Sequence, residues 1–274
     1  MLRLKLLALI YNRGGFRDLQ VDDELVCLLS QAITSCIRHD YCPSELEWIG
    51  RIESSRRELE GSDERIIQST EKYLDTFIDV EDEGKTEKKS NLAADSTQKW
   101  GGLLLFNLVR TLKPQVVIEL GTLFGISCAY MAASCKITGS GKVISVDKSR
   151  PRLEVARRNI QGLGLEDQVL IKNTSFEETL SQIKEDDCRI DLAFIDGHKD
   201  GRALLSYYRQ IRSMASTRAV IVIDDIRFSK EMNDAWNKIC EMESGNTVID
   251  LDRMGLVGLS GRGTEGIKAK IIPV

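Results

Sequence analysis

Three carboxylates and two basic side chains follow two apolar runs of the sequence. Asp196, His198 and Lys199 come at the end of RIDLAFID, and Asp224 and Asp225 end RAVIVIDD. If these runs are neighbouring parallel strands, their carboxyl ends meet at one edge of a sheet and the three carboxylates converge there. Such oxygen ligands hold Mg²⁺, which lowers the pKa of a bound hydroxyl. Lys199 and His198 are then the candidate bases.

A second set of residues has the character of a nucleoside site. The run QVVIEL continues into ELGTLFG, which contains Glu119, Gly121 and Gly125, and the next run, KVISVD, ends in Asp147. The glycine spacing departs from the dinucleotide pattern G-x-G-x-x-G, and Glu119 would repel a pyrophosphate. A carboxylate at Asp147 is placed to accept hydrogen bonds from ribose hydroxyls. The set therefore favours a nucleoside without phosphates. The alternative is that the glycines serve only helix–strand packing, but it would not explain Glu119 and Asp147.

The elements that must position these residues follow the sequence pattern of a parallel sheet. Short apolar runs alternate with segments of helical length, which is typical of an α/β fold with helices on both faces of the sheet. The five expected strands are residues 115–120, 142–147, 168–173, 189–196 and 218–225. Two more candidates, 247–259 and 268–274, are separated by so few residues that we expect them to form an antiparallel hairpin.

The N-terminal third has a different character. Residues 21–39 and 44–60 have helical periodicity, whereas residues 79–96 are nearly free of large apolar side chains and are interpreted as a linker or loop. The sequence thus predicts a helical N-terminal cap and charged linker over 1–90 and a catalytic core over 91–274.

The composition limits the classes of partner. The chain has 274 residues, 42% of them hydrophobic, with a net charge of -4 and a pI near 5.5. This acidic balance argues against a nucleic-acid or anionic-membrane surface, so we expect a small-molecule partner. Seven scattered cysteines indicate reduced thiols and a cytoplasmic location. Neither a signal peptide nor a transmembrane stretch is expected, and a homodimer is an open possibility.

Taken together, ELGTLFG and SVD resemble the first two motifs of the class I S-adenosylmethionine-dependent methyltransferases, over roughly residues 91–274. The resemblance implies a Rossmann-like, seven-stranded sheet with an antiparallel last strand. It also implies a cofactor site composed of Glu119, Gly121, Thr122, Gly125, Asp147, Ser175, Phe176 and Asp196. In that site Gly121 and its neighbours would line the methionine part, Glu119 would lie near its amino group, Asp147 would hold the ribose, and Ser175 and Phe176 would contact adenine.

The acceptor side is similar to metal-dependent small-molecule O-methyltransferases. Asp196 and Lys199 match the Asp-x-x-Lys pattern of the catechol type, although Asp225 replaces its asparagine. The pair Asp224–Asp225 matches the sugar type, which has histidine where Lys199 stands. The resemblance implies methyl transfer to a hydroxyl, with Mg²⁺ at Asp196, Asp224 and Asp225. We expect a lowered pKa to make Lys199 the base, with His198 as the alternative.

Several other interpretations stay open at this stage. Asp224 and Asp225 would lack a catalytic role if they merely cap a helix beginning near Ser229. The chain would be a binding protein if it keeps the nucleoside pocket without turnover. A macromolecular acceptor is the third alternative, although no base-reading motif or basic track supports it.

Overall fold

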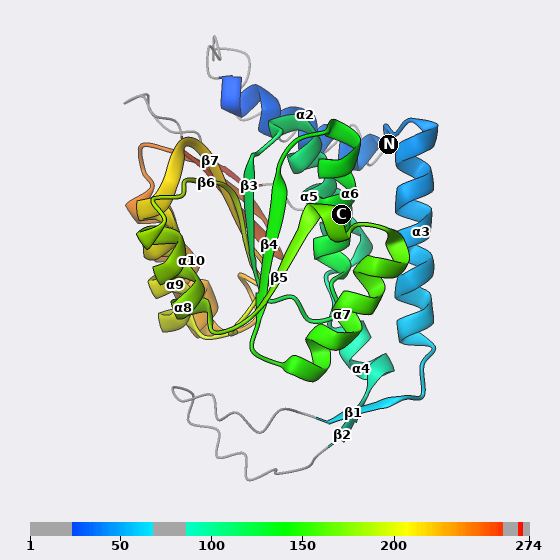
Figure 1. Ribbon diagram of the computed structural model, residues 1–274. Helices are drawn as coiled ribbons and strands as arrows, with labels where there is room; N and C mark the ends of the chain where they lie inside the picture. The colour runs from blue at the N-terminus through cyan, green and yellow to red at the C-terminus, as the bar shows by residue number, and fades with distance from the viewer. Residues whose placement is uncertain (1–23, 68–85, 260–267, 271–274) are drawn as a thin grey trace.

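A single large sheet organises the computed structural model, which describes residues 24–67, 86–259 and 268–270 (Figure 1). Its strand order is β10-β8-β9-β7-β6-β3-β4-β5. The strands are β3 (Val116–Leu120), β4 (Lys142–Asp147), β5 (Val169–Asn173), β6 (Ile190–Ile195), β7 (Ala215–Ile223), β8 (Thr247–Leu251), β9 (Met254–Gly258) and β10 (Lys268–Lys270). The strands β3 to β7 pair in parallel, and β9 is antiparallel to both β7 and β8. The five parallel strands expected from the sequence are confirmed, as is the reversed strand near the end.

Helices cover both faces of this sheet (Figure 1). The helices are α2 (Glu24–Arg38), α3 (Pro43–Glu60), α4 (Lys89–Ala94), α5 (Lys99–Leu112), α6 (Ile126–Thr138), α7 (Arg150–Leu163), α8 (Phe176–Glu185), α9 (Gly201–Met214) and α10 (Lys230–Met242), with a 3₁₀ turn at Glu166–Gln168. One hydrophobic cluster joins α2, α3, α5, α6 and α7 to the sheet, and the other joins α8, α9 and α10 to its opposite face.

Because side chains alternate between the two faces along a strand, the strands contribute residues to both clusters. In β3, Val117 belongs to the first cluster and the next residue, Ile118, to the second. Phe194 and Ile195 divide in the same way at the end of β6. Because successive side chains of a strand point to opposite faces, a continuous apolar run is what a sheet covered on both sides requires. The central strands are therefore rigidly held, and the residues that follow them are fixed in position.

The end of the sheet differs from the expected hairpin. Residues 247–259 do not form one strand but the pair β8 and β9, which are joined by a turn at Asp252 and Arg253. Asp252 has φ +70°, a left-handed conformation that aspartate tolerates better than most residues. The last described strand, β10, pairs in parallel with β8 rather than antiparallel with the strand before it. The expectation of a hairpin between 247–259 and 268–274 was wrong, because β8 lies between β9 and β10.

The N-terminal helices share their core with the rest of the chain. Leu29 of α2 and Ile52 of α3 are fully buried in the cluster that contains α5 and α6. Part of the expected linker is structured, since β2 (Thr86–Lys88) pairs with β1 (Arg65–Ile67) and leads into α4. The boundary between residues 90 and 91 stays a prediction. Within the described ranges, no helix combines the length and the apolar character needed to cross a membrane.

Candidate functional site

A cleft lies at the carboxyl ends of the central strands, where the strand order reverses between β3 and β6. Twelve residues line it: Leu92, Asp95, Gly121, Leu123, Asp147, Lys148, Arg152, Phe176, Asp196, Gly197, His198 and Lys199. Its volume, measured out to open solvent, is about 840 Å³. A topological switch point is where open α/β sheets bind their ligands. Six of the residues expected from the sequence line this cleft: Gly121, Asp147, Phe176, Asp196, His198 and Lys199.

Close backbone packing forms the floor of the cleft. Gly121 has φ +114°, and a Cβ atom there would lie 2.7 Å from the carbonyl oxygen of Asp196. The chain after β3 therefore passes the chain after β6 closely enough that only glycine fits. Gly197 plays a similar part, because a side chain there would clash with the Phe176 ring. These glycines bring the two strand ends together.

The wall of the cleft combines a carboxylate with an aromatic ring. Asp147 ends β4, and its two carboxylate oxygens accept hydrogen bonds from the backbone N–H groups of Leu123 and Ser149, at 3.1 and 2.8 Å. These bonds fix the carboxylate while leaving each oxygen a further lone pair. Phe176 lies opposite, with its ring centroid 5.1 Å from that of His198. An apolar ring and a fixed acceptor are what the base and ribose of a nucleoside require, so these residues fit the expected cofactor.

Four of the expected cofactor residues do not line the cleft. Glu119 is fully buried, and its two carboxyl oxygens accept hydrogen bonds from Ser127 and Ser145. Thr122 is also buried and shares a hydrogen bond with Ser145. Because β4 and α6 enclose its side chain, Glu119 does not line the cleft, and its place near the amino group of the cofactor stays a prediction. Burial raises the pKa of Glu119 to about 8.

Gly125 and Ser175 serve helix ends instead. Gly125 is the N-cap of α6 with φ +78°, and Ser175 is the N-cap of α8, where its hydroxyl accepts a hydrogen bond from the N–H of Glu178. Both residues shape the loops beside the cleft without lining it. Their contacts with the cofactor stay predictions, since the sequence pattern alone does not separate a capping role from binding.

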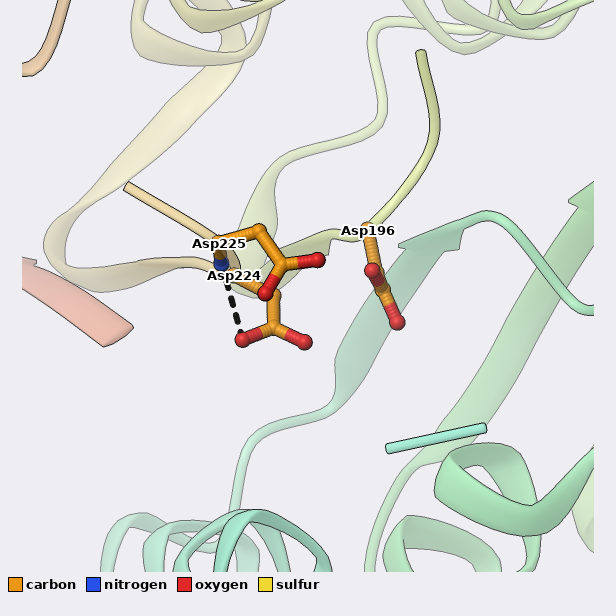
Figure 2. Close-up of side chains that lie close together, drawn as sticks. All are labelled: Asp196, Asp224 and Asp225. Atoms are coloured by element: carbon orange, nitrogen blue, oxygen red, sulfur yellow. Dashed lines mark hydrogen bonds between the residues drawn. The ribbon is translucent and has the colours of Figure 1, made fainter. Parts of the chain in front are cut away.

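The three aspartates lie close together, and Asp196 is the one of them that lines the cleft (Figure 2). One oxygen from each of Asp196, Asp224 and Asp225 lies within 4.8 Å of the others, and this is the one group of possible metal ligands among the described residues. The expected convergence is confirmed. The helix-cap alternative for Asp224 and Asp225 is wrong, since the hydroxyl of Ser229 caps α10 by accepting from the N–H of Met232.

Two basic side chains form ion pairs with this cluster. The Lys199 ammonium group lies 2.7 Å from Asp196 Oδ1 and 2.6 Å from Asp225 Oδ2. The Arg253 guanidinium donates to both oxygens of Asp224, at 3.0 and 3.2 Å, and lies 3.1 Å from Asp225 Oδ1. As arranged, Lys199 and Arg253 are the cations that pair with these carboxylates, and a divalent cation would compete with them.

The charges in the cluster shift its pKa values. Burial, with the charge of Asp224, raises the pKa of Asp196 to about 7. Burial by itself would lower the pKa of Lys199, but the charges of Asp196 and Asp225 and the hydrogen bonds to them outweigh it and raise that pKa above its ordinary value. The expectation that Lys199 has a lowered pKa is therefore wrong for this arrangement.

His198 has a different set of neighbours. Its Nδ1 lies 2.8 Å from the hydroxyl of Tyr207, and that hydroxyl donates to Glu177. The residue has φ +51°, a conformation that costs energy outside glycine and is often found at functional sites. Burial lowers its pKa below the ordinary value. His198 is thus positioned by its own polar network, apart from the acidic cluster.

A link from the N-terminal region also reaches the cluster. The hydroxyl of Thr97 donates to Asp196 Oδ2 at 3.2 Å, and the Thr97 carbonyl accepts a hydrogen bond from Arg56 of α3 at 2.8 Å. Arg56 and Thr97 are both buried. Helix α3 therefore lies two hydrogen bonds away from Asp196.

Sequence reasoning missed the residues that come from other parts of the chain, chiefly Arg253, Thr97 and Tyr207. Arg253 follows Asp252 in the turn between β8 and β9, within residues 247–259, which were expected to form one strand. An Asp-Arg pair within an apolar run is a turn signal, and it was the available clue. Nothing local marks Thr97 or Tyr207, because their partners are distant in the sequence.

Comparisons with known proteins agree with this site. Residues 118–226 match the family model described as a methyltransferase domain. A catechol O-methyltransferase of Niastella koreensis is 25% identical over 210 residues, which cover 71% of this chain and 93% of that protein. A catechol O-methyltransferase of Mycobacterium tuberculosis is 30% identical over 125 residues, 46% of this chain and 54% of that protein.

Solved structures show the same fold. An O-methyltransferase from Bacillus cereus, in complex with S-adenosylhomocysteine, aligns with a TM-score of 0.53 at 21% identity and covers 62% of this chain and 85% of that one. A methyltransferase of Podospora anserina bound to S-adenosylhomocysteine aligns with a TM-score of 0.56 at 14% identity and covers 87% of this chain and 97% of that one. Together with the sheet order and the cleft at the switch point, these matches show an α/β methyltransferase fold and a chain that is similar to class I S-adenosylmethionine-dependent O-methyltransferases.

Proposed function

We propose that the protein transfers the methyl group of S-adenosylmethionine to a hydroxyl oxygen of a small molecule. The observation that carries this proposal is the cleft that brings Gly121, Asp147 and Phe176 together with His198 and Lys199. The first three suit a nucleoside, and the last two suit an acceptor hydroxyl. The cofactor supplies a sulfonium-bound methyl group, which passes to the acceptor oxygen as the hydroxyl loses its proton.

Lys199 and His198 have different roles in this reaction. Lys199, held as a cation by Asp196 and Asp225, presents positive charge to the acceptor oxygen and favours its ionised form. His198 lines the same cleft, and its lowered pKa leaves it neutral and able to take the proton near neutral pH. Lys199 as the base is the alternative that the catechol-type pattern favours, and it requires the lysine to leave its two carboxylate partners.

Mg²⁺ bound by Asp196, Asp224 and Asp225 is the alternative source of positive charge at the acceptor oxygen. Convergence of the three carboxylates favours it, and their engagement with Lys199 and Arg253 argues against it. A metal titration of the full chain separates the two sources of charge.

The acidic balance of the chain supports a small-molecule acceptor over a nucleic acid. The seven free cysteines support a cytoplasmic setting. A homodimer is compatible with this activity, and sedimentation of the full chain would establish the assembly.

Cofactor binding tests the proposal directly. Titration calorimetry should show binding of S-adenosylhomocysteine, with NAD much weaker. Asp147→Ala should weaken the binding by about 1–3 kcal/mol, the usual worth of hydrogen bonds to a charged acceptor. Equal affinity for NAD, or unchanged affinity in Asp147→Ala, would contradict the proposal.

Asp191→Ala is the matched control. Asp191 stands at the opposite end of the sheet and also accepts two backbone hydrogen bonds, from the N–H groups of Gln115 and Val116 at 2.9 and 3.1 Å. Its loss should cost a similar amount of stability without changing the affinity for the cofactor.

A further inference from the structure

All six oxygens of the acidic cluster have a partner within the protein. For Asp196, Oδ1 pairs with Lys199 and Oδ2 accepts from Thr97. For Asp224, Oδ1 accepts from the Arg253 Nε and from the N–H of Asp225, and Oδ2 accepts from the Arg253 Nη2. For Asp225, Oδ1 pairs with Arg253 and Oδ2 with Lys199. Two cations thus face three carboxylates, and a metal ion would have to share these oxygens with partners that already hold them.

The backbone fixes Arg253 in this position. It lies in the turn between β8 and β9, where its N–H donates to the carbonyl of Leu251 at 2.9 Å. Its carbonyl accepts from the N–H of Ile226, at 3.0 Å, in the loop that follows Asp225. The turn is thereby attached to the loop that carries the two aspartates. The guanidinium contact is a property of how β7, β8 and β9 join, and it is not a chance contact of a surface side chain.

The geometry of the guanidinium also favours the pair over a metal. Arg253 binds Asp224 through two parallel hydrogen bonds, the arrangement that makes arginine–carboxylate pairs strong and specific. The Asp224 side chain is fully buried. Mg²⁺ keeps several water ligands and requires near-octahedral oxygen positions. To bind here it would have to displace one cation from a buried carboxylate and a second from Asp196 and Asp225, and leave both without partners.

We infer that Arg253 and Lys199 occupy the place that a divalent cation takes in metal-dependent relatives, so that methyl transfer by this chain is independent of metal. Arg253 is the positioning residue of this arrangement, because it holds Asp224 and Asp225 while Lys199 reaches the cleft. The inference rests on the proposed function, and it deepens that proposal by assigning the positive charge at the acceptor oxygen to the protein itself.

The test is Mn²⁺ binding to the full chain, measured by the electron paramagnetic resonance signal of free Mn²⁺ and by thermal unfolding with and without a chelator. The wild type should show no saturable binding in the micromolar range and no change of melting temperature on chelation. Arg253→Gln removes one cation and opens the oxygens of Asp224, so it should bind Mn²⁺ at least about tenfold more tightly than the wild type. A purely structural role for Arg253 would not create a metal site.

Two variants control for charge and for general damage. Arg253→Lys keeps the positive charge and should bind Mn²⁺ no better than the wild type. Arg227→Gln removes an arginine from a different aspartate, Asp250, and should also behave like the wild type. Saturable micromolar binding by the wild type, or a folded Arg253→Gln that gains no affinity for Mn²⁺, would overturn the inference. If Arg253→Gln does not fold, the wild-type titration decides.

Affinity for S-adenosylhomocysteine, measured on the same samples, separates the two proposals. If no sample binds it, the proposed function fails whatever the metal result. If the wild type binds it and also binds Mn²⁺, the proposed function stands and the inference about Arg253 fails.

Discussion

Replacement of the buried carboxyl at Glu119 should change how stability depends on pH. Glu119→Gln keeps the shape of the side chain and one donor and one acceptor for Ser127 and Ser145, which now hydrogen-bond to the two carboxyl oxygens. Burial raises the pKa of Glu119 from 4.5 to about 8. The folded wild type therefore carries a neutral carboxyl at neutral pH, where the unfolded chain carries a carboxylate. A neutral amide is a close substitute for that group.

The direction of the effect follows from proton binding. Between pH 4.5 and 8 the folded state holds a proton at Glu119 that the unfolded state has lost, so this group's contribution to stability is complete below pH 4.5 and is lost as pH rises through 8. The interval from 4.5 to about 8, at roughly 1.4 kcal/mol for each pH unit, corresponds to about 5 kcal/mol in all. Most of it, about 3 kcal/mol, falls between pH 5 and pH 8.

The assay is urea unfolding of the wild type and Glu119→Gln at a series of pH values. The free energy of unfolding of the variant, relative to that of the wild type, should rise by about 3 kcal/mol from pH 5 to pH 8. Glu45→Gln is the matched control with the opposite sign. Burial acts against ionisation of Glu45, but hydrogen bonds from Cys42 and Arg110 prevail and lower its pKa, so its charge is stabilising at neutral pH. Parallel curves for the wild type and Glu119→Gln would refute the reasoning.

Further predictions concern the base and the floor of the cleft. If His198 takes the proton, kcat/KM with an identified acceptor should reach its plateau below about pH 7, whereas a rise that continues above about pH 9 would assign the base to Lys199. His198→Ala and Lys199→Met should each reduce methyl transfer by roughly 10²–10⁴-fold and leave S-adenosylhomocysteine affinity nearly unchanged, and indifference to both would remove these residues from the mechanism. Gly121→Ala should lower the free energy of unfolding by about 3 kcal/mol or more, because its Cβ would lie against the backbone of Asp196. Gly139 also has a positive φ but has open space around it, so Gly139→Ala should lower the free energy of unfolding by only about 1 kcal/mol. Chemical denaturation measures both variants, and equal losses would contradict the clash at Gly121.

The parallel part of the fold was predictable because it rests on patterns local to each strand. The runs that became β3 to β7 are short, mostly apolar and separated by segments of helical length, which is the pattern of a parallel sheet covered by helices. Their carboxyl ends must lie along one edge, so the convergence of Asp196 with Asp224 and Asp225 followed from topology alone. The hairpin at the end was missed because residues 247–259 were expected to form one strand, although Asp252 and Arg253 interrupt their apolar run.

The chemistry of the site was less accessible than its location. The type of residue at a strand end says that a carboxylate is present, but not which way its side chain points. Glu119 and Asp147 both end strands, and β4 and α6 enclose the first while the second lines the cleft. The partner of Asp224 is Arg253, from a hairpin 29 residues later in the chain, and no periodicity reports such a contact. Charge compensation of Asp224 depends on that distant residue.

The hydrogen bonds that join Arg56 to Thr97 and Thr97 to Asp196 have a consequence for protein engineering. Helix α3 is not an interchangeable attachment, because it supplies the donor that holds the Thr97 carbonyl beside the reactive end of the cleft. A chimaera that takes its first helices from a relative would keep the sheet and its cleft. It would also inherit a different anchor for Thr97, and so a different orientation of Asp196. Transplants at the beginning of this chain should therefore include the segment between α4 and α5, which contains Thr97, together with α3, so that the helix and the residue it holds are exchanged as one unit.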